Sequence, residues 1–381
     1  MALRFPYCSN SCYIFRPIGN HGDHPSSLKH KQAAIRCSSA RSARRPQNVP
    51  GEFYVDHTCI DCDVCRWMAP NSFTRVESQS AVYNQPSTST QRVAALQALL
   101  SCPTASIHTE TPPADILQAH STFPIPIHED SLPGVYHCGY HSKKSFAAAS
   151  YFIKRPGGNI LVDSPRYSER LAQNLQELGG VDYFFLTHKD DVADHDRWQK
   201  RFNCPRILHE QEVTADTAGV EIKLKGKGPW DFLGPDIDLL FFPGHTEASV
   251  CLHLKPLKVL FSGDSIANIP QGYLHVDPNF NWYSVDIQME SIKTLLPLDF
   301  LWILPGHGRR AKYNNVEEKN KAINDLLDSV YVRVAPLPSI EQNHLQKASL
   351  HDLARTTIKL SIHGTKLTRL VHTGYTRLSI F

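Results

Sequence analysis

Residues 186–195 read LTHKDDVADH and place metal-ligating side chains directly after an apolar run, YFFL, at 183–186. The acids and histidines of the stretch are His188, Asp190, Asp191, Asp194 and His195. Imidazole nitrogen and carboxylate oxygen are ligands that first-row metals accept. A metal site at the exit of a strand and an ordinary solvated loop are the two interpretations, and the rest of the sequence decides between them.

Four more such side chains follow apolar, strand-like runs. Asp163 ends NILVD, His245 lies in the turn PGHT, Asp264 ends FSGD and His307 lies in LPGHG. A packed sheet can hold side chains rigidly at its strand exits, next to space for a cavity. These residues and the 186–195 stretch are therefore predicted to converge on one metal site.

The order of these motifs resembles the metallo-β-lactamase superfamily over about residues 135–330. The resemblance implies an α/β fold, an αββα sandwich with one or two divalent metal ions (Zn, Fe or Mn) at a sheet edge. Asp163 would support the site and Asp194 would orient or deprotonate a water molecule as the catalytic acid–base group. The metal ligands carried over from the family are His188, Asp190, Asp194, His195, His245, Asp264 and His307.

The first motif departs from the family signature Thr-His-x-His-x-Asp-His. Asp190 stands where the second histidine is expected, and two extra residues precede Asp194. One pocket is expected to contain His188, Asp190 and His245, with Asp191 replacing Asp190 if the loop is shifted by one residue. The other pocket would contain Asp194, His195 and His307, with Asp264 bridging the two. The added carboxylate favours iron or manganese over zinc, and it leaves open a site for a single metal.

Cysteine spacing indicates a second cofactor. Cys59-x2-Cys62-x2-Cys65, followed by Cys102-Pro103, is the ligand set of a bacterial-type ferredoxin. Residues 52–108 resemble single-cluster [4Fe–4S] ferredoxins, which implies a small α+β domain before the sandwich. A zinc site is the alternative, although zinc knuckles use paired Cys-x2-Cys hooks. The other cysteines outside the leader, Cys138, Cys204 and Cys251, are expected to be buried small hydrophobes.

Composition sets the boundaries of the domains in this chain of 381 residues. The first fifty residues contain one acid, eight Lys/Arg and seven Ser, the composition of an organelle transit peptide. We expect a plastid (stromal) leader at 1–48, the ferredoxin-like domain at 52–108, a linker at 109–134, the sandwich at 135–332 and a poorly ordered tail at 333–381. A mitochondrial address is the alternative for the leader.

Hydrophobic periodicity predicts the elements of the sandwich. Strands are expected at 150–154, 159–163, 183–187, 237–242, 249–254, 259–262 and 300–304, and helices at 168–178, 196–202 and 315–330. No apolar run reaches the ~20 residues that a membrane-spanning helix needs. The net charge of +3 gives no reason to expect a nucleic-acid partner.

Three functions fit these motifs. The first is a metallohydrolase that cleaves an ester, thioester or lactone of a small molecule. The second is an iron-dependent oxidoreductase that receives electrons from its own ferredoxin domain. A redox partner protein is a further expectation of this function. Flavodiiron proteins resemble this chain in having a carboxylate at the position of Asp190. The third is a non-enzymatic cluster carrier or sensor. Metal content of protein prepared anaerobically would discriminate between them.

Overall fold

The computed structural model describes residues 43–334, 360–362 and 365–367. Residues up to Ser329 belong to one compact unit, which contains all the motifs discussed above. Of the second unit, from Val330 onward, the structure describes the end of one helix and a short hairpin, β19 (Leu360–Ile362) paired with β20 (Thr365–Leu367). The predicted tail at 333–381 therefore lies largely outside the described residues.

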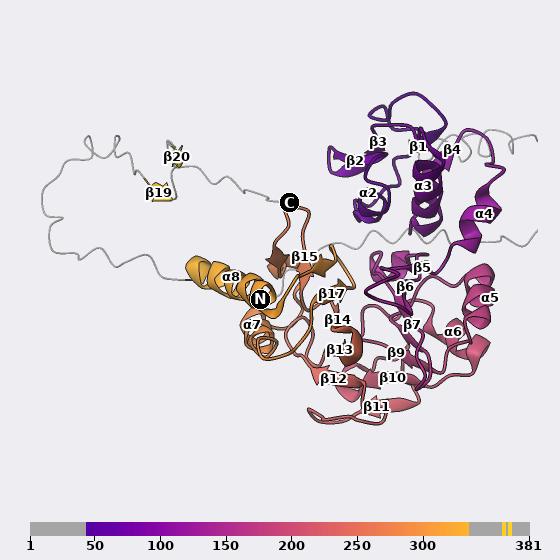
Figure 1. The fold of residues 1–381 in the computed structure, drawn as a ribbon. Helices are drawn as coiled ribbons and strands as arrows, with labels where there is room; N and C mark the ends of the chain where they lie inside the picture. Colours follow the sequence, from indigo (N-terminus) through magenta and orange to yellow (C-terminus); the bar gives the residue numbers. More distant parts are fainter. Residues whose placement is uncertain (1–42, 335–359, 363–364, 368–381) are drawn as a thin grey trace, which may run out of the picture. The chain divides into compact units, whose positions relative to one another are not determined.

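The N-terminal domain is a small α+β fold, drawn in indigo and violet in Figure 1. Strand β1 (Phe53–Val55) pairs with β4 (Ile107–Thr109), and β2 (Phe73–Val76) pairs with β3 (Gln79–Val82), both antiparallel. Helices α2 (Val64–Met68) and α3 (Ser89–Ser101) complete it. The Thr88 side chain caps α3 by accepting from the Gln91 N–H. Its core is built from residues such as Phe53, Phe73, Leu96 and Ile107.

The boundary expected at residue 48 is wrong, because residues from 44 onward are part of this domain. Arg44 forms a β-bridge with Asp56. Arg45 is 2% exposed, and its guanidinium donates to the carbonyl oxygens of Val76 and Ser80. A basic composition alone does not show whether an arginine lies in a leader or is buried in a domain with hydrogen bonds to the backbone. Residues 1–42 of the predicted transit peptide lie outside the described part.

The segment 109–134, expected as a linker, also contains regular structure. It includes helix α4 (Ile116–Ser121) and strand β5 (Ile125–Pro126), which pairs with β6 (Val135–His137) at the edge of the larger sheet. Phe123 is 2% exposed and packs with Tyr140 at a ring distance of 5.0 Å. The prolines therefore mark an edge strand and turns, where a missing N–H costs little.

Two sheets form the second domain (Figure 1). The seven-stranded sheet has the order β11-β10-β9-β8-β7-β6-β5, and the five-stranded sheet has the order β12-β13-β14-β17-β18. The remaining strands of the first sheet are β7 (Tyr151–Ile153), β8 (Ile160–Val162), β9 (Tyr183–Phe185), β10 (Arg206–His209) and β11 (Ile222–Leu224). Those of the second are β12 (Ile237–Phe241), β13 (Val250–Leu254), β14 (Val259–Gly263), β17 (Trp302–Pro305) and β18 (Ala311–Lys312).

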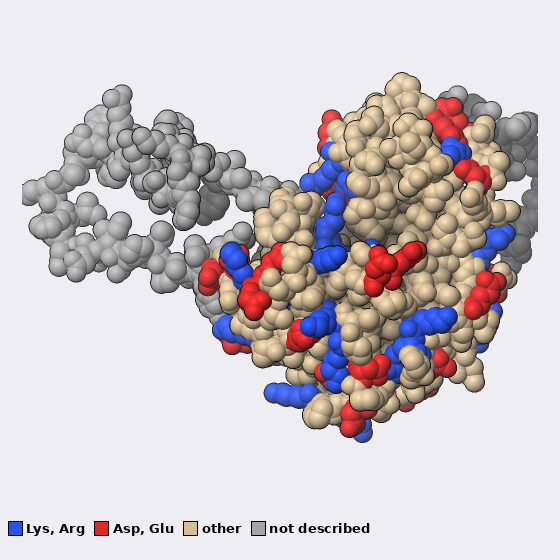
Figure 2. Space-filling model, viewed as in Figure 1, with Lys and Arg blue, Asp and Glu red and all other residues tan. Residues whose placement is uncertain are grey.

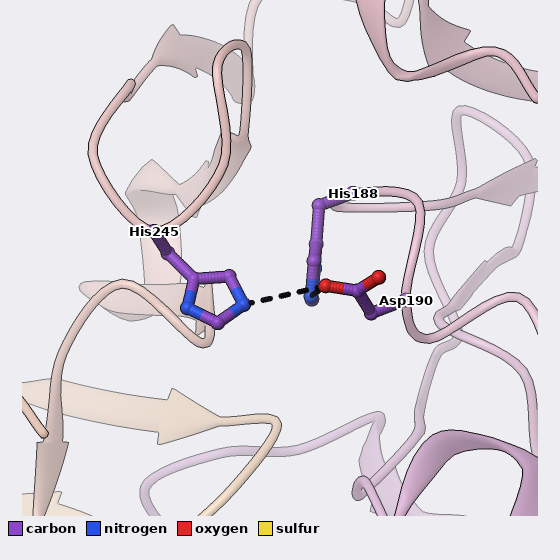
Figure 3. Close-up of side chains that lie close together, drawn as sticks. All are labelled: His188, Asp190 and His245. Atoms are coloured by element: carbon purple, nitrogen blue, oxygen red, sulfur yellow. Dashed lines mark ion pairs between the residues drawn. The ribbon is translucent and has the colours of Figure 1, made fainter. Parts of the chain in front are cut away.

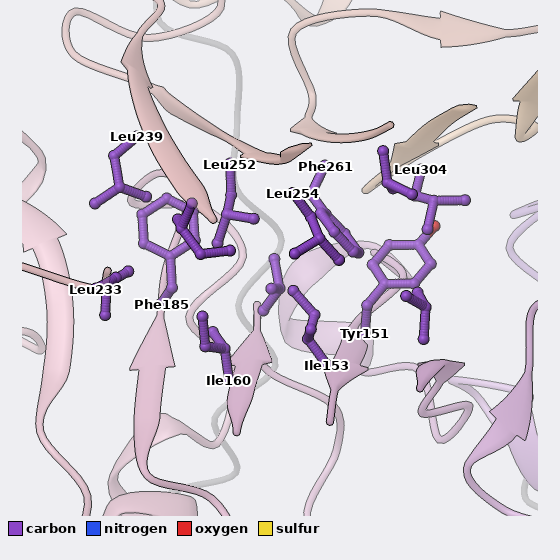
Figure 4. Close-up of a cluster of buried hydrophobic side chains, with 14 of the residues drawn as sticks. Tyr151, Ile153, Ile160, Phe185, Leu233, Leu239, Leu252, Leu254, Phe261 and Leu304 are labelled. Atoms are coloured by element: carbon purple, nitrogen blue, oxygen red, sulfur yellow. The ribbon is translucent and has the colours of Figure 1, made fainter. Parts of the chain in front are cut away.

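The inner faces of the two sheets share one apolar core (Figure 4). Ile160 and Phe185 from the first sheet, and Leu252 and Phe261 from the second, are fully buried in it. Because strand side chains alternate between faces, the other face of each sheet needs its own cover. Helices α5 (Glu169–Glu177) and α6 (His195–Phe202) contribute Leu171, Leu175 and Trp198 to a second core with β7–β10. Helices α7 (Val285–Lys293) and α8 (Val316–Val334) belong to the other half of the sandwich.

The predicted strands and helices are all present, with ends that coincide or are shifted by up to four residues. Strands β8 and β9 run parallel, as do β14 and β17, so their carboxyl ends meet at one edge of the sandwich. A short pair, β15 (Ala267–Asn268) with β16 (Leu274–His275), follows β14. Cys138, Cys204 and Cys251 are buried, as expected.

Surface charge is mixed. On the face shown in Figure 2, acidic and basic side chains are interspersed. Among the described residues, no helix has the length and apolar character to cross a bilayer.

Candidate metal centre and cluster site

The exits of five strands supply the side chains of the metal centre. Asp163 directly follows β8, and His188 lies three residues beyond β9. His245 follows β12, Asp264 directly follows β14, and His307 lies two residues beyond β17. Since these strand ends share one edge of the sandwich, residues far apart in the chain become neighbours.

One oxygen atom lies at the centre of the constellation. Asp264 Oδ2 is 3.6 Å from the Nε2 atoms of His188, His245 and His307 alike. Asp190 Oδ2 is 3.8 Å from His188 Nε2 and 3.6 Å from His245 Nε2. Figure 3 shows His188, Asp190 and His245 turned toward one another. The Asp264 carboxylate therefore lies among the three histidines, and its role as a bridging ligand remains a prediction.

These separations suit atoms arranged around a metal ion. They are too long for hydrogen bonds between the ligands. Ligand atoms at ~2.1 Å from a tetrahedral metal lie ~3.4 Å from each other, close to the separations observed. Two candidate groups of ligand atoms within 4.8 Å of one another are His188, Asp190 and His245, and His188, Asp191 and Asp264.

Unsatisfied polar atoms provide an independent test of whether the residues fit a metal. Four buried atoms without a hydrogen-bond partner in the described structure come from this cluster: His188 Nε2, His245 Nε2, Asp191 Oδ2 and Asp264 Oδ1. A buried polar atom with no partner costs ~1–3 kcal/mol, so four in one cluster require a shared partner. A divalent cation supplies one, and the residues present therefore fit a metal centre.

A hydrogen-bond chain fixes the tautomer of His188. The Asp163 carboxylate accepts from the Thr187 backbone N–H at 2.8 Å and from its hydroxyl at 3.0 Å. The same hydroxyl lies 2.9 Å from His188 Nδ1. Because the hydroxyl donates to Asp163, Nδ1 must donate to the hydroxyl, which leaves the Nε2 lone pair free for a metal. Asp163 thus contacts His188 through the Thr187 hydroxyl.

Two glycines make the close approach possible. A Cβ at Gly306 would lie 2.6 Å from Asp264 Oδ1 and 2.9 Å from Asp191 Oδ2. At Gly244 (φ +147°) a Cβ would lie 2.3 Å from the Gln288 backbone. The glycines of PGHT and LPGHG therefore allow His245 and His307 to follow directly after tightly packed turns.

Asp191, rather than Asp194, lies with the second set of ligands. Asp191 is 1% exposed, and its Oδ1 is 3.9 Å from His307 Nε2. The Asp194 carboxylate instead accepts from Lys144 Nζ at 2.7 Å and from the Tyr167 N–H at 2.9 Å. The sequence predicts Asp191 only as a replacement for Asp190 and places Asp194 in the second pocket. The structure corrects this: Asp191, and not Asp194, lies in the second pocket.

His195 is likewise held elsewhere. Its Nδ1 accepts from Arg206 Nη1 at 2.8 Å, and Arg206 also pairs with Asp196 and Glu221. His195 begins α6, and the side-chain contacts of its ring are with Arg206 and Asp196. The structure thus brings together His188, Asp190, His245, Asp264 and His307, and it does not add Asp194 or His195 to them.

Sequence reasoning missed Glu212, which is fully buried in the short helix η2 (Glu210–Glu212). Its carboxylate accepts from the Ala248 N–H at 2.7 Å and from the Lys189 N–H at 3.2 Å. It therefore ties the loop after His188 to the loop after His245. No sequence pattern marks it, because both of its partners are backbone atoms.

We expect Glu212→Ala to destabilise the fold by about 2–4 kcal/mol, because it leaves the buried Ala248 N–H and the part-buried Lys189 N–H without an acceptor. Metal affinity should fall as well, since two ligand loops lose their common anchor. Chemical denaturation and metal titration measure the two effects. Glu210→Ala, at an exposed position in the same short helix, is the matched control, and an equal loss in both variants would contradict the anchoring role.

Electrostatics show how strongly the centre depends on a cation. Burial lowers the pKa of His188 to about 4 and raises the pKa of Asp163 to about 8. Burial, together with Asp264 and Asp163, raises the pKa of Asp191 well above its ordinary value. Burial alone would raise the pKa of Asp264 too, but His307, His188 and His245 lower it.

The metal-free protein should lose stability as the pH rises from about 6.5 to 8. The pKa values of Asp163 and Asp191 are higher in the folded than in the unfolded protein, so these carboxyls bind protons more tightly in the folded state. Proton binding therefore stabilises the fold, and this stabilisation is lost as the pH rises. The lowered pKa of His188 changes the stability of the fold only below about pH 6.5. Thermal unfolding of the chelated protein measures the trend, and added divalent metal should abolish it. A midpoint that rises with pH over this range would contradict the prediction.

The second cofactor site is in the N-terminal domain. Cys59, Cys62, Cys65 and Cys102 line one small cavity, and none of the four forms a disulfide. Asp61 and Asp63 adopt positive φ angles of 60° and 65°, which bends the Cys-x2-Cys-x2-Cys run around this cavity. The structure therefore brings all four predicted cysteines together.

Backbone donors point at the sulfurs. Ser80 N–H donates to Cys59 Sγ at 3.4 Å, and Ser106 N–H donates to Cys102 Sγ at 3.3 Å. Burial raises the pKa of the Cys62 thiol to about 12, so its thiolate needs a bound cation. Hydrogen bonds to sulfur are among the features that tune iron–sulfur clusters, and the donor set fits such a group.

Comparison with known proteins agrees with both sites. Residues 55–109 match the 4Fe-4S single cluster domain of Ferredoxin I, and residues 145–307 match the metallo-beta-lactamase superfamily. These matches support an iron–sulfur cluster in the first domain and a divalent metal in the second.

Among curated proteins, the chain is similar to a hydroxyacylglutathione hydrolase of Rhizobium meliloti (strain 1021), with 30% identity over 31% of this chain and 46% of that protein. It is 27% identical to another of that name from Synechococcus sp. (strain JA-2-3B'a(2-13)), over 30% of this chain and 48% of that protein. The chain thus spans about half the length of these curated relatives.

Among solved structures, a metallo-beta-lactamase family protein from Thermus thermophilus superposes with a TM-score of 0.41 at 18% identity, over 53% of this chain and 81% of that one. Residues 145–307 of the chain thus match the metallo-beta-lactamase superfamily, and they follow a region, residues 55–109, that matches a single-cluster 4Fe-4S domain.

Proposed function

We propose that the protein is a metal-dependent hydrolase that cleaves a thioester or ester of a small acid. The observation that carries this proposal is the equal 3.6 Å separation of Asp264 Oδ2 from three histidine Nε2 atoms, with four buried ligand atoms unsatisfied around it. The names of the two curated hydrolases support the thioester in particular, because hydroxyacylglutathione is a thioester.

His188, Asp190, His245 and Asp264 would hold one ion, and Asp191, Asp264 and His307 would hold a second. A divalent ion there would lower the pKa of a water molecule and polarise the carbonyl of the substrate. Asp191 Oδ2 has no hydrogen-bond partner among the described residues, so it is available to accept the proton of the attacking water. This role replaces the one that the sequence assigned to Asp194, whose carboxylate binds Lys144 and the Tyr167 N–H.

His307 marks the side from which substrate approaches. Its side chain is 39% exposed, whereas those of His188 and His245 are 1% and 6% exposed. Substrate can therefore reach the centre past His307 or past Asp190, whose side chain is 42% exposed, while the other two histidines stay shielded from water. The orientation chain from Asp163 through Thr187 holds His188 rigid during turnover.

The test is thiol release from a hydroxyacyl-glutathione thioester by the full chain, purified anaerobically with its metals. We expect turnover that chelation abolishes and metal addition restores. Asp190→His should retain hydrolysis but shift the bound metal from iron or manganese toward zinc, because it restores a softer nitrogen ligand. Absence of turnover on thioesters and on simple aryl esters, with the metal present, would overturn the proposal.

A second function, an iron-dependent oxidoreductase, is favoured by one contact between the domains. The cluster ligand Cys62 and the metal ligand His307 line the same cavity. Asp63, next to Cys62, binds Arg309, two residues from His307, at 2.7 Å and 3.0 Å. A one-electron transfer between a cluster and an iron ion held at the two sites would cross this cavity.

A Cys62→Ser variant with its metal centre occupied tests that second function. If the cluster exchanges electrons with the centre, reducing the wild-type protein should change the metal spectrum and the activity, and the variant should not respond. Unchanged spectra and equal activity in both proteins would rule out the coupling and leave the hydrolase.

A further inference from the structure

We propose that Arg310 binds the anionic group of the substrate in the cavity between the two domains, so that the substrate is a small molecule with a carboxylate or similar oxyanion near the bond that is cleaved. The proposal rests on the proposed hydrolase function, because it identifies the substrate class of that same centre.

The cavity has a volume of about 260 Å³ and walls from both domains. Cys62 and Trp67 come from the cluster domain, and Tyr151, His307 and Arg310 from the sandwich. At ~30 Å³ for each water molecule, it holds on the order of nine waters, which is below the range of sites for drug-sized ligands. The cavity therefore suits a short acyl group better than a nucleotide or a long chain.

The walls are basic. Two arginines and two histidines line the cavity, and none of the described residues in its walls is acidic. One of the arginines is neutralised, since Arg309 makes two hydrogen bonds to the Asp63 carboxylate. That pair holds the two domains together at this position and leaves Arg309 no charge to offer a ligand.

Arg310 differs from its neighbour in this respect. No carboxylate forms an ion pair with it within residues 43–334, and its Nη2 atom is buried without a hydrogen-bond acceptor there. Its guanidinium carbon lies 4.7 Å from the centre of the Trp67 ring and 6.0 Å from that of Tyr151. The aromatic faces fix the guanidinium in place without neutralising it.

The position of Arg310 places an anion bound by it close to the metal centre. Arg310 lies three residues after His307, on the turn between β17 and β18, and both side chains line the same space. An oxyanion bound by the planar guanidinium fork would place a neighbouring carbonyl toward His307. The cluster domain then has a second role, because Trp67 forms the platform on which the recognising cation rests.

Calorimetric binding of lactate and of its uncharged amide, lactamide, to the full chain with cluster and metal in place tests the proposal. We expect lactate to bind at least about tenfold more tightly than lactamide. Arg310→Gln should remove that preference, Arg310→Lys should retain part of it, and Arg309→Lys, which keeps the charge beside Asp63, should bind lactate within about threefold of wild type. Metal analysis and cluster absorbance show that each variant is intact.

Equal binding of lactate and lactamide, or unchanged lactate binding by Arg310→Gln, would overturn the assignment. Lactate binding that survives in Arg310→Gln but disappears in His245→Ala would show that the metal alone holds the carboxylate, which also overturns it. If Arg310→Gln does not fold, the comparison of Arg310→Lys with wild type decides. None of these results bears on hydrolysis of an uncharged thioester, so the proposed function is tested separately.

Discussion

The His245→Ala variant is expected to lose most of its non-cluster metal and about 1,000-fold in hydrolytic rate, which corresponds to ~4 kcal/mol. His245 Nε2 is a buried atom that lies 3.6 Å from both Asp190 Oδ2 and Asp264 Oδ2, so its removal opens one pocket completely. Elemental analysis and thiol release measure the two effects. The cluster absorbance should be unchanged, because the four cysteines lie in the other domain.

His253→Ala is the matched control for this change. His253 is also buried, on β13 of the same sheet, but its ring binds the Asp299 carbonyl. The control should keep its metal even if it is less stable. If His245→Ala retained all its metal, or if both variants lost it equally, the histidine would not be a ligand.

The second large effect distinguishes two neighbouring aspartates. Asp191→Ala is expected to remove the second metal and to lower activity about 100-fold or more, because Asp191 and Asp264 are the two carboxylates beside His307. Asp194→Ala should keep its metals and lose about 1–2 kcal/mol of stability, from its bond to the Tyr167 N–H and its pair with Lys144. Metal stoichiometry and denaturation curves measure both.

The opposite result for the two variants would support Asp194 as the metal ligand, as the family signature suggests. Loss of metal in Asp194→Ala, with full occupancy in Asp191→Ala, would mean that the loop after β9 rearranges when metal binds. Equal loss in both variants would show that the loop as a whole, rather than one carboxylate, supports the second ion.

The contrast between these two residues shows what the sequence could predict. Apolar runs such as those of β9 and β14 indicated the strands, and the polar residues after them indicated the shared edge of the sheets. The loop KDDVADH has no hydrophobic period, so its conformation was not readable. Its path depends on tertiary contacts, such as the bond from Ser164 N–H to the Asp191 carbonyl and the left-handed φ of Ala193 at 31°.

Contacts between distant segments were also beyond sequence reasoning. Asp63 and Arg309 are separated by 246 positions; Asp63 is a spacer residue of the cysteine run, and nothing in that motif or in LPGHG predicts that the two side chains pair. Arg45, counted as part of a basic leader, proved to be buried against backbone carbonyls. Such pairings follow from how the folded elements pack, which residue types and spacing do not determine.

Metal content of a cluster-free variant tests the central claim most directly. In the double variant Cys62→Ser, Cys65→Ser, prepared anaerobically, any metal that remains belongs to the centre at the sheet edge. We predict at least one iron or manganese ion per chain in that variant, and almost none once His245→Ala is added. A cluster-free protein without metal, or one that keeps its metal after His245→Ala, would contradict the assignment of His188, Asp190, His245 and Asp264 as a metal centre.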